Sequence, residues 1–361
     1  AVVSQAIVRL PASRRPRHRL IHTGQHFEAG MSDVFFRHLA LPRPAHSLGL
    51  GGTSPATQLG RMLGALANIF QREQPDVVIV YGDTTSTLAG ALAAALVHVP
   101  IAHVEAGLRS FNRQMPEETN RVLTDHLSTW LFCSSETGAK NLAAEGITRG
   151  VSVVGDVMVD ALVQTRSSLV KRQSAILKKW SVEPSGYYLA TVHRAENTTE
   201  AHEVLALLHT FAMLDLPTIL PLHPRTRNLL QRAGWRVPRR GPLRVAPPIP
   251  YLDMLVLERH AKAILTDSGG IQKEAYYWGV PCLTLRNETE WVETIQTGWN
   301  RLVGTQPRTI RVALSQLNGM AHARRPDLYG SGDAGSARVK QLVQDLRQHR
   351  HHRGDRDHQF F

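Results

Sequence analysis

Short apolar segments rich in β-branched residues alternate along this chain with longer stretches of helical length, such as 54–72, 85–97 and 200–213. Strands that alternate with helices are typical of βαβ units, whose strands form a parallel sheet. Several apolar runs have no polar face, as expected for a sheet that helices cover on both sides. The pattern predicts strands over residues 20–24, 76–83, 101–107, 130–135, 151–156, 187–193, 218–223, 243–248, 261–268 and 281–286.

A polar break near residues 160–185 divides these strands into two series. A chain of 361 residues is too long for one hydrophobic core and suits two domains. We therefore predict an α/β protein with two Rossmann-like, doubly wound domains that face a cleft, over residues 1–165 and 166–333. In such sheets, ligands bind at the carboxyl ends of the strands.

Composition narrows the classes of partner. The formal net charge of +12 suits a polyanion, either nucleic acid or a small phosphate-rich ligand. Aromatic residues do not interleave with the basic ones, so we expect no nucleic-acid partner. No apolar run reaches about 18 residues, so we expect a soluble protein with no membrane partner. The two cysteines favour a reducing, cytoplasmic setting. We expect residues 348–361 to be a disordered tail and its histidines to form no metal site.

The clearest local signal is ILTDSGGIQKEA, residues 264–275. A predicted strand runs into Ser268, Gly269 and Gly270, where a predicted helix starts. Glycines let a phosphate approach the backbone, and a helix N-terminus offers unpaired N–H groups. Glu274 lies one turn into that helix, where it is placed to accept hydrogen bonds from ribose hydroxyls. An ordinary helix cap and tight turn is the alternative. A second glycine pattern, GSGDAG at 330–335, follows no strand and does not predict a dinucleotide site.

Acidic residues gather at predicted strand ends of the first domain. Asp83 and Glu105 each end an apolar run, and Glu117 opens a helix in which Arg121 follows four residues later. Singly, each has an ordinary alternative, a helix cap or a surface ion pair. Together with a phosphate loop, they form the set that acid–base chemistry on a nucleotide-linked substrate needs. Two strand ends of the second domain predict an anion site with His193, Arg194, His223 and Arg225.

Eight motifs occur together: TGQHFEAGMSDVFF, YGDTTSTLAGALAA, HVEAGLRS, MPEETNRVLTDH, TVHRAEN, LHPRT, TDSGGIQKEA and LRNETEWVET. Over about residues 1–345, they closely resemble the non-hydrolysing UDP-N-acetylglucosamine 2-epimerase family. The resemblance implies the glycosyltransferase-B fold, with a last helix at about 334–347 that packs back on the first domain. It also implies interconversion of UDP-N-acetylglucosamine and UDP-N-acetylmannosamine by elimination and re-addition of UDP through a 2-acetamidoglucal, without a cofactor.

The resemblance assigns roles to the matching residues. Asp83, Glu105 and Glu117 match the acid–base residues, with Arg121 orienting Glu117, and His193 matches a catalytic-site histidine near the diphosphate. The UDP contacts are matched by Ser268, Gly269, Gly270 and Glu274. Some bacterial relatives bind a second, activating UDP-N-acetylglucosamine, and the residues that match this site are Gln25, Arg61, Arg194 and His223. We accordingly expect a UDP-sugar substrate, a UDP-N-acetylglucosamine activator and a homodimer.

Two features leave alternatives open. The family opens with a strand and a G-x-R-P-x-x-x-K loop, whereas this sequence starts in what resembles the following helix. We therefore expect an unpaired edge in the first sheet and weaker diphosphate contacts, and a non-catalytic UDP-sugar-binding relic is one alternative. A glycosyltransferase of the same fold is another, which the joint presence of the three acids disfavours. MSDVFF and ETEWVET also resemble the branch that acts on UDP-2,3-diacetamido-glucuronate, so a 3-acetamido or uronate substrate stays open.

Overall fold

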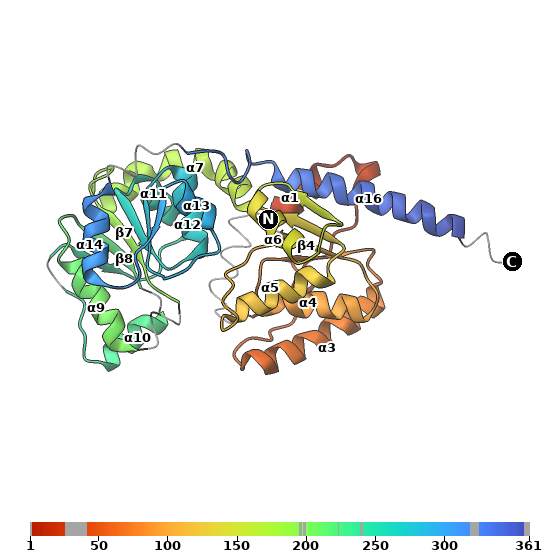
Figure 1. Cartoon of the computed structure of the whole chain (residues 1–361), viewed down its shortest axis with the longest axis horizontal. Coiled ribbons are helices and arrows are strands. Elements are labelled where there is room, and N and C mark those ends of the chain that lie inside the picture. The colour runs from red at the N-terminus through yellow and green to blue at the C-terminus, as the bar shows by residue number, and fades with distance from the viewer. Residues whose placement is uncertain are drawn as a thin grey trace. The chain divides into compact units, whose positions relative to one another are not determined.

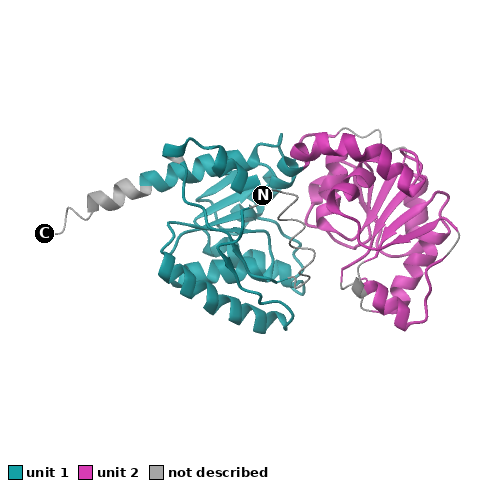
Figure 2. Ribbon diagram, turned by 180° about the vertical axis from the view of Figure 1, so that it is seen from behind, with its two compact units in different colours: residues 1–161, 328–361 teal, residues 162–327 magenta. Residues whose placement is uncertain are grey.

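The computed structural model describes residues 2–25, 42–194, 197, 200–222, 224–238, 241–317 and 325–356. The chain divides into two compact units, unit 1 with residues 1–161 and 328–361 and unit 2 with residues 162–327 (Figure 1, Figure 2). Both contain parallel sheets with helices, which confirms the predicted α/β class. Among the described residues, no helix is long and apolar enough to cross a membrane.

The main sheet of unit 1 is covered by helices on both faces. Alanine-rich α4 (Thr85–Leu96) lets the chain pack closely, and Thr84 caps it by accepting from the Thr87 N–H. On one face, α3 (Pro55–Glu73) and α4 pack against Val80 of the sheet. On the other face lie α1 (Val2–Arg9) and α16 (Ala334–Arg356): Val339 of α16 packs against α1, and Leu342 of α16 packs against β4 and β5. The strand order is β3 (Val78–Tyr81), β4 (Ile101–Ala106), β5 (Trp130–Cys133) and β6 (Val151–Val153), with α5 (Pro116–Leu127) and α6 (Glu136–Ala144) as connections.

Among the described residues, strand β3 pairs on one side, with β4. The short strands β1 (Ile21–His22) and β2 (His46–Ser47) form a separate parallel pair, and among the described residues β1 does not pair with β3. A cavity of about 1030 Å³ is lined by residues of both strands, including Ile21 and Val78, and by apolar residues of α3 and α16. In the described part of unit 1, β3 thus has an open edge.

Unit 2 has a complete doubly wound sheet. Its strand order is β12 (Asn300–Leu302), β11 (Cys282–Thr284), β10 (Ala263–Thr266), β7 (Tyr188–Thr191), β8 (Thr218–Pro221) and β9 (Leu243–Ala246). The order reverses between β7 and β10, which is the switch point where such sheets bind ligands. Its helices are α9 (Ala201–Ala212), α10 (Pro224–Arg232), α11 (Tyr251–His260), α12 (Gly269–Trp278), α13 (Val292–Gln296) and α14 (Pro307–Ser315), and α7 (Val157–Trp180) contains the boundary between the units.

Helix α16 belongs to unit 1, and Asp160 holds its start. The Asp160 carboxylate accepts hydrogen bonds from the N–H groups of Ala334 and Gly335 at 3.0 and 2.7 Å. A Cβ on Gly335 would lie 2.3 Å from Val2, so this glycine of GSGDAG serves packing. The helix runs to Arg356, and residues 357–361 lie outside the described part, so the disordered tail stays a prediction.

Gly107, which follows β4, offers a test of this packing. It has φ +80°, and an added Cβ would lie 2.2 Å from the carbonyl oxygen of Gly138. Gly146 has φ +82° with open space around it, so Gly146→Ala is a matched control for backbone strain alone. We expect Gly146→Ala to cost about 1–2 kcal/mol of unfolding free energy and Gly107→Ala about 1–3 kcal/mol more. Urea unfolding of both variants measures the difference, and equal losses would contradict the close approach.

Candidate active site

Two acids predicted from the sequence lie at the carboxyl ends of adjacent strands of unit 1. Asp83 follows β3, and Glu105 sits in β4 at a bulge, where the register with β5 shifts between Val104 and Ala106. Glu105 has φ +76°, which is uncommon for a residue other than glycine. Its Oε2 lies 3.4 Å from where a Cβ on Gly82 would be. The bulge therefore turns Glu105 toward the loop that carries Asp83.

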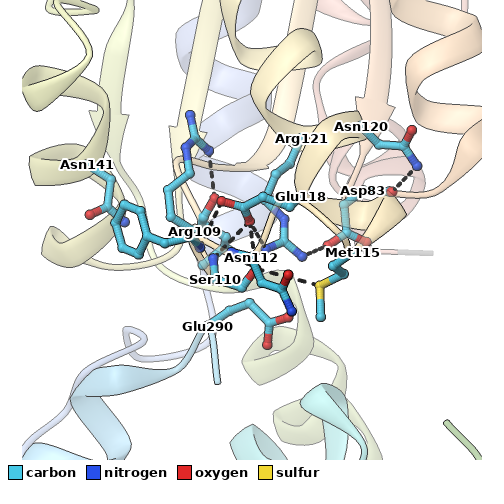
Figure 3. Close-up of polar contacts among 12 residues, drawn as sticks. Asp83, Arg109, Ser110, Asn112, Met115, Glu118, Asn120, Arg121, Asn141 and Glu290 are labelled. Carbon is cyan, nitrogen blue, oxygen red and sulfur yellow. Dashed lines mark hydrogen bonds and ion pairs between the residues drawn. The ribbon is translucent and has the colours of Figure 1, made fainter. Parts of the chain in front are cut away.

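Arg121 joins Asp83 to helix α5 (Figure 3). Its guanidinium donates to Asp83 Oδ2 at 2.6 Å and to Glu118 Oε2 at 2.8 Å. The side chain of Asn120 donates to the backbone carbonyl of Asp83 at 2.9 Å. Arg121 is 2% exposed and Glu118 4%, so water screens this ion pair little. Asp83 is thus held in one orientation at the strand end.

Glu118 forms an ion pair with Arg121, whereas the sequence predicts that Arg121 orients Glu117. The prediction pairs Arg121 with Glu117, whereas Glu118 lies on the guanidinium, three residues before it in the same helix. Glu118 also accepts from the N–H groups of Ser110 and Phe111, at 2.8 and 3.0 Å, and so orders the loop before α5. The sequence signal for this pair is the spacing of three residues between Glu118 and Arg121, which places both side chains on one face of a helix. Glu117 is half-buried in the first turn of α5, and its acid–base role stays a prediction.

Beneath these residues lies a buried network that the sequence analysis did not single out. The ring of His103 bonds to Asp125 through Nδ1 at 2.6 Å and to the carbonyl of Gly82 through Nε2 at 2.8 Å. Arg109 donates to Asp125 at 2.7 Å and to both oxygens of Glu145 at 2.6 and 2.7 Å. Burial alone would raise the pKa of Asp125, but the His103 hydrogen bond and the charges of His103 and Arg109 hold it below its ordinary value.

The network fixes the two strand ends that carry the acids. Asp125 Oδ2 accepts the N–H of Gly107 at 3.1 Å, directly after β4, while His103 holds the Gly82 carbonyl directly before Asp83. The two ring nitrogens of His103 thus face a carboxylate oxygen and a backbone carbonyl oxygen. Charged and hydrogen-bonding residues inside the apolar run HVEAGLR were the sequence signal for such a network.

In unit 2, the predicted phosphate loop lies at the switch point between β7 and β10. Ser268 caps α12 by accepting from the Ile271 N–H at 3.5 Å. A Cβ on Gly269 would approach Trp291 Nε1 to 3.1 Å, which favours glycine there. Gly270 follows within the first turn of α12. The N-terminus of this helix therefore combines a positive partial charge with little side-chain bulk, as an anion site requires.

Asp267 organises the neighbouring end of β7 and is a residue whose role the sequence did not assign. This buried carboxylate accepts from the backbone N–H of His193 at 3.0 Å, from that of Arg194 at 3.0 Å and from Asn197 Nδ2 at 3.1 Å. His193 Nδ1 also lies 3.1 Å from it. Burial would raise the pKa of Asp267, but these hydrogen bonds and the His193 charge lower it. The His193 side chain, 48% exposed, is thus oriented by an ionised acid.

Glu274 lies in α12, and Tyr251 of α11 donates its hydroxyl to Glu274 Oε1 at 3.1 Å. The residues matched to an activator site are distributed over both units. Gln25 Oε1 accepts from the Ser86 N–H at 2.8 Å, Arg61 is exposed on α3, and Arg194 Nη2 lies 3.9 Å from Glu290. His223 and the side chain of Arg225 lie outside the described residues. In the part of the chain that the structure describes, no cluster of three or more His, Cys, Asp or Glu could hold a metal ion.

Comparison with known proteins helps to decide whether this site is that of an epimerase or of a glycosyltransferase. A model of the UDP-N-acetylglucosamine 2-epimerase family matches residues 9–344. The chain belongs to this family. It is 45% identical to a UDP-N-acetylglucosamine 2-epimerase homolog of Methanococcus maripaludis, over 91% of this chain and 92% of that one. It is 42% identical to the UDP-2,3-diacetamido-2,3-dideoxy-D-glucuronate 2-epimerase of Pseudomonas aeruginosa, over 96% of both chains.

Solved structures of the family share the fold. The UDP-GlcNAc 2-epimerase of Methanocaldococcus jannaschii, in complex with UDP-GlcNAc and UDP, superimposes with a TM-score of 0.84 at 37% identity, over 95% of this chain and 96% of that one. The Neisseria meningitidis enzyme bound to UDP-GlcNAc gives 0.82 at 29% identity, over 95% and 96%. Family membership supports the predicted epimerase over a glycosyltransferase.

The Asp125 network yields a pH-dependent prediction. Asp125→Asn leaves His103 and Arg109 without their shared counter-charge, so we expect a loss of about 3–5 kcal/mol in unfolding free energy at pH 7. Because the folded-state pKa of Asp125 is lowered, its contribution is present above the unfolded value of about 3.9 and is lost as pH falls through the folded value. The gap between wild type and variant should therefore shrink in acid.

Urea unfolding from pH 7 down to about pH 3 measures this gap. Glu73→Gln is the control, because it breaks partly exposed ion pairs with Arg19 and His46 and should cost at most about 1 kcal/mol. A constant gap between wild type and Asp125→Asn at all pH values would contradict an ionised Asp125.

Proposed function

We propose that this chain interconverts the C2 epimers of a UDP-linked 2-acetamido sugar, as between UDP-N-acetylglucosamine and UDP-N-acetylmannosamine. The observation that carries the proposal is that a member of this family has acids at strand ends in unit 1 and a helix N-terminus suited to anions in unit 2; we call each of these a half-site. Unit 1 holds Asp83 and Glu105 at adjacent strand ends on a rigid network, and unit 2 presents a helix N-terminus at its switch point. Proton transfer and diphosphate binding are the two requirements of such a reaction.

The reaction proceeds by elimination and re-addition. A carboxylate removes the C2 proton, the C1–O bond breaks with its electron pair leaving on UDP, and a C1=C2 double bond forms in the glucal. UDP then adds back at C1 while a proton is delivered to the opposite face of C2. A sugar C2–H is a weak acid, so stabilising the departing UDP anion at the α12 N-terminus helps to lower the barrier.

Removal from one face and delivery to the other require acids on both sides of the sugar. Asp83, Glu105 and Glu117 are the candidates, and Arg121 orients the first of them. His193 presents its imidazole beside the phosphate loop, where it is placed to bind or protonate a diphosphate oxygen. Ser268, Gly269 and Gly270 bind the diphosphate, and Glu274 accepts from the ribose hydroxyls.

The substituents at C3 and C6 of the sugar are open between two relatives. The Pseudomonas aeruginosa protein, named for UDP-2,3-diacetamido-2,3-dideoxy-D-glucuronate, matches 96% of this chain, which favours that substrate as a second candidate. Both UDP-sugars should therefore be assayed in parallel. The homodimer, the UDP-N-acetylglucosamine activator and the cytoplasmic location remain predictions from the sequence.

Proton NMR in D₂O tests the reaction itself. With the right UDP-sugar, deuterium should enter at C2 while the manno epimer appears, because the C2 proton exchanges with solvent on the base. Transfer of the sugar to an acceptor without exchange at C2 would favour a glycosyltransferase. Absence of exchange with both UDP-sugars would contradict the proposal.

Removing the charge of each acid tests its role. Asp83→Asn, Glu105→Gln and Glu117→Gln should each lower kcat by about a hundredfold or more, since proton transfer by a positioned side chain contributes that much. The Kd for UDP should stay unchanged, because these residues lie in unit 1. Glu136→Gln, at an exposed position of the same unit, is the control and should keep full activity. Near-normal turnover in all three variants would contradict the acid–base roles of these residues.

Binding of UDP tests the other half-site. Glu274→Ala should raise the Kd for UDP by about tenfold or more, because it removes hydrogen bonds to a charged acceptor. Glu183→Ala, an exposed acid of unit 2, should leave the Kd unchanged. Isothermal titration calorimetry measures both, and an unaltered Kd for Glu274→Ala would remove this residue from the nucleotide site.

A further inference from the structure

The loop that precedes α5 carries an aromatic ring that the proposed mechanism does not use. The Phe111 side chain is 76% exposed, more than that of any other large hydrophobic residue in the described part of the chain. Its backbone has φ +59°, and no other apolar residue among those described combines a side chain with a positive φ. A side chain disfavours left-handed backbone, and water disfavours an exposed apolar ring. Phe111 therefore has two unfavourable features at once.

Buried Glu118 holds the backbone of Phe111 in this conformation. Its Oε1 accepts from the Phe111 N–H at 3.0 Å, and its Oε2 accepts from the N–H and the hydroxyl of Ser110 at 2.8 and 2.9 Å. The Ser110 hydroxyl oxygen in turn accepts from the Asn112 N–H at 3.3 Å. Because Glu118 is 4% exposed, water competes little with its hydrogen bonds. The ring is thus presented by a loop with one defined backbone conformation.

The same glutamate connects Phe111 to the candidate acid–base residue Asp83 (Figure 3). Arg121 donates to Glu118 Oε2 at 2.8 Å and to Asp83 Oδ2 at 2.6 Å. One carboxylate and one guanidinium group therefore lie between the Phe111 N–H and the Asp83 carboxylate. The contacts that orient Asp83 also fix the loop from which the Phe111 ring projects.

A ligand that covers the ring would account for these features. A single exposed hydrophobic residue is ordinary on a protein surface, but a strained backbone conformation that buried contacts enforce is typical of functional sites. In the proposed reaction, the part of the substrate that reaches Asp83 is the sugar, whereas UDP binds at the α12 N-terminus. A pyranose ring carries C–H groups on its faces, and an aromatic ring offers a flat apolar surface to pack against them.

We propose that Phe111 contacts the substrate: its ring packs against a C–H face of the sugar of the UDP-linked substrate and holds that sugar beside Asp83. This inference rests on the proposed function, in which Asp83 acts at C2 of the sugar. The contact is apolar, so it requires no particular group at C3 or C6 and suits both candidate substrates. Because the ring acts on the sugar, it should contribute to binding of a UDP-sugar and not to binding of UDP.

The test compares the full chain with Phe111→Gly, which removes the ring, and Phe111→Tyr, which keeps it. Calorimetry at pH 7 gives the Kd for UDP-N-acetylglucosamine, for UDP-2,3-diacetamido-2,3-dideoxy-D-glucuronate and for UDP. For the UDP-sugar that the wild type binds more tightly, we expect Phe111→Gly to raise the Kd by about three- to tenfold, as for one aromatic contact. The Kd for UDP should stay within about twofold, and Phe111→Tyr should bind all three ligands within about twofold of wild type.

Two further readouts separate this contact from a structural role. Proton NMR should show upfield shifts of the sugar ring protons in the wild type and Phe111→Tyr but not in Phe111→Gly, because only an aromatic ring produces a ring-current shift. The Tm of Phe111→Gly should not fall below that of the wild type, because glycine adopts positive φ without strain. Leu96→Ala, at a site 66% exposed in the same unit, is the matched control and should leave every Kd unchanged.

Three results would overturn the sugar contact. One is a Kd for the UDP-sugar in Phe111→Gly within about twofold of wild type, and another is an equal rise in the Kd for UDP and for the UDP-sugar. The third is an altered oligomeric state of Phe111→Gly with an unchanged Kd, which would mean that a second copy covers the ring. A wild type that binds a UDP-sugar without exchange at C2 would contradict the proposed function and still report the contact. Binding of neither UDP-sugar would overturn both.

Discussion

The buried contact of Asp125 with His103 and Arg109 is the constraint on which the two strand ends of unit 1 that carry Asp83 and Glu105 depend. Charges out of water are costly unless each has a partner and its hydrogen bonds are satisfied. Asp125 meets that demand by accepting from His103, Arg109 and the Gly107 N–H together. Since His103 also holds the Gly82 carbonyl, one carboxylate sets the positions of two strand ends.

The two units solve the same problem of positioning acids in different ways. In unit 1, one arginine lies between two carboxylates: Arg121 pairs with Asp83 and with Glu118 and so fixes their orientation. In unit 2, the hydroxyl group of Tyr251 donates a hydrogen bond to Glu274 at 3.1 Å. An ion pair fixes a carboxylate beside a charge, whereas a hydroxyl donor fixes it through one directed hydrogen bond.

Both half-sites follow from parallel strands, whose carboxyl ends meet at one edge of a sheet. In unit 2, the complete order of six strands creates the switch point between β7 and β10, where His193, Asp267 and Ser268 come together. In the described part of unit 1, β3 has an open edge beside a cavity of about 1030 Å³. Asp83 keeps its place there because β4, the bulge at Glu105 and Arg121 hold it from the other side.

The sequence by itself determined the α/β class, the two units and the strand ends that carry polar residues, because periodicity and helix signals are local. It also determined the family, since its motifs hold many residues in a fixed order. Only the tertiary structure decided that Arg121 contacts Glu118, that Asp125 pairs with both His103 and Arg109, and that Tyr251 donates to Glu274. These contacts depend on which side chains are buried together, away from water. Burial and its cost for an unpaired charge arise only when distant segments pack together.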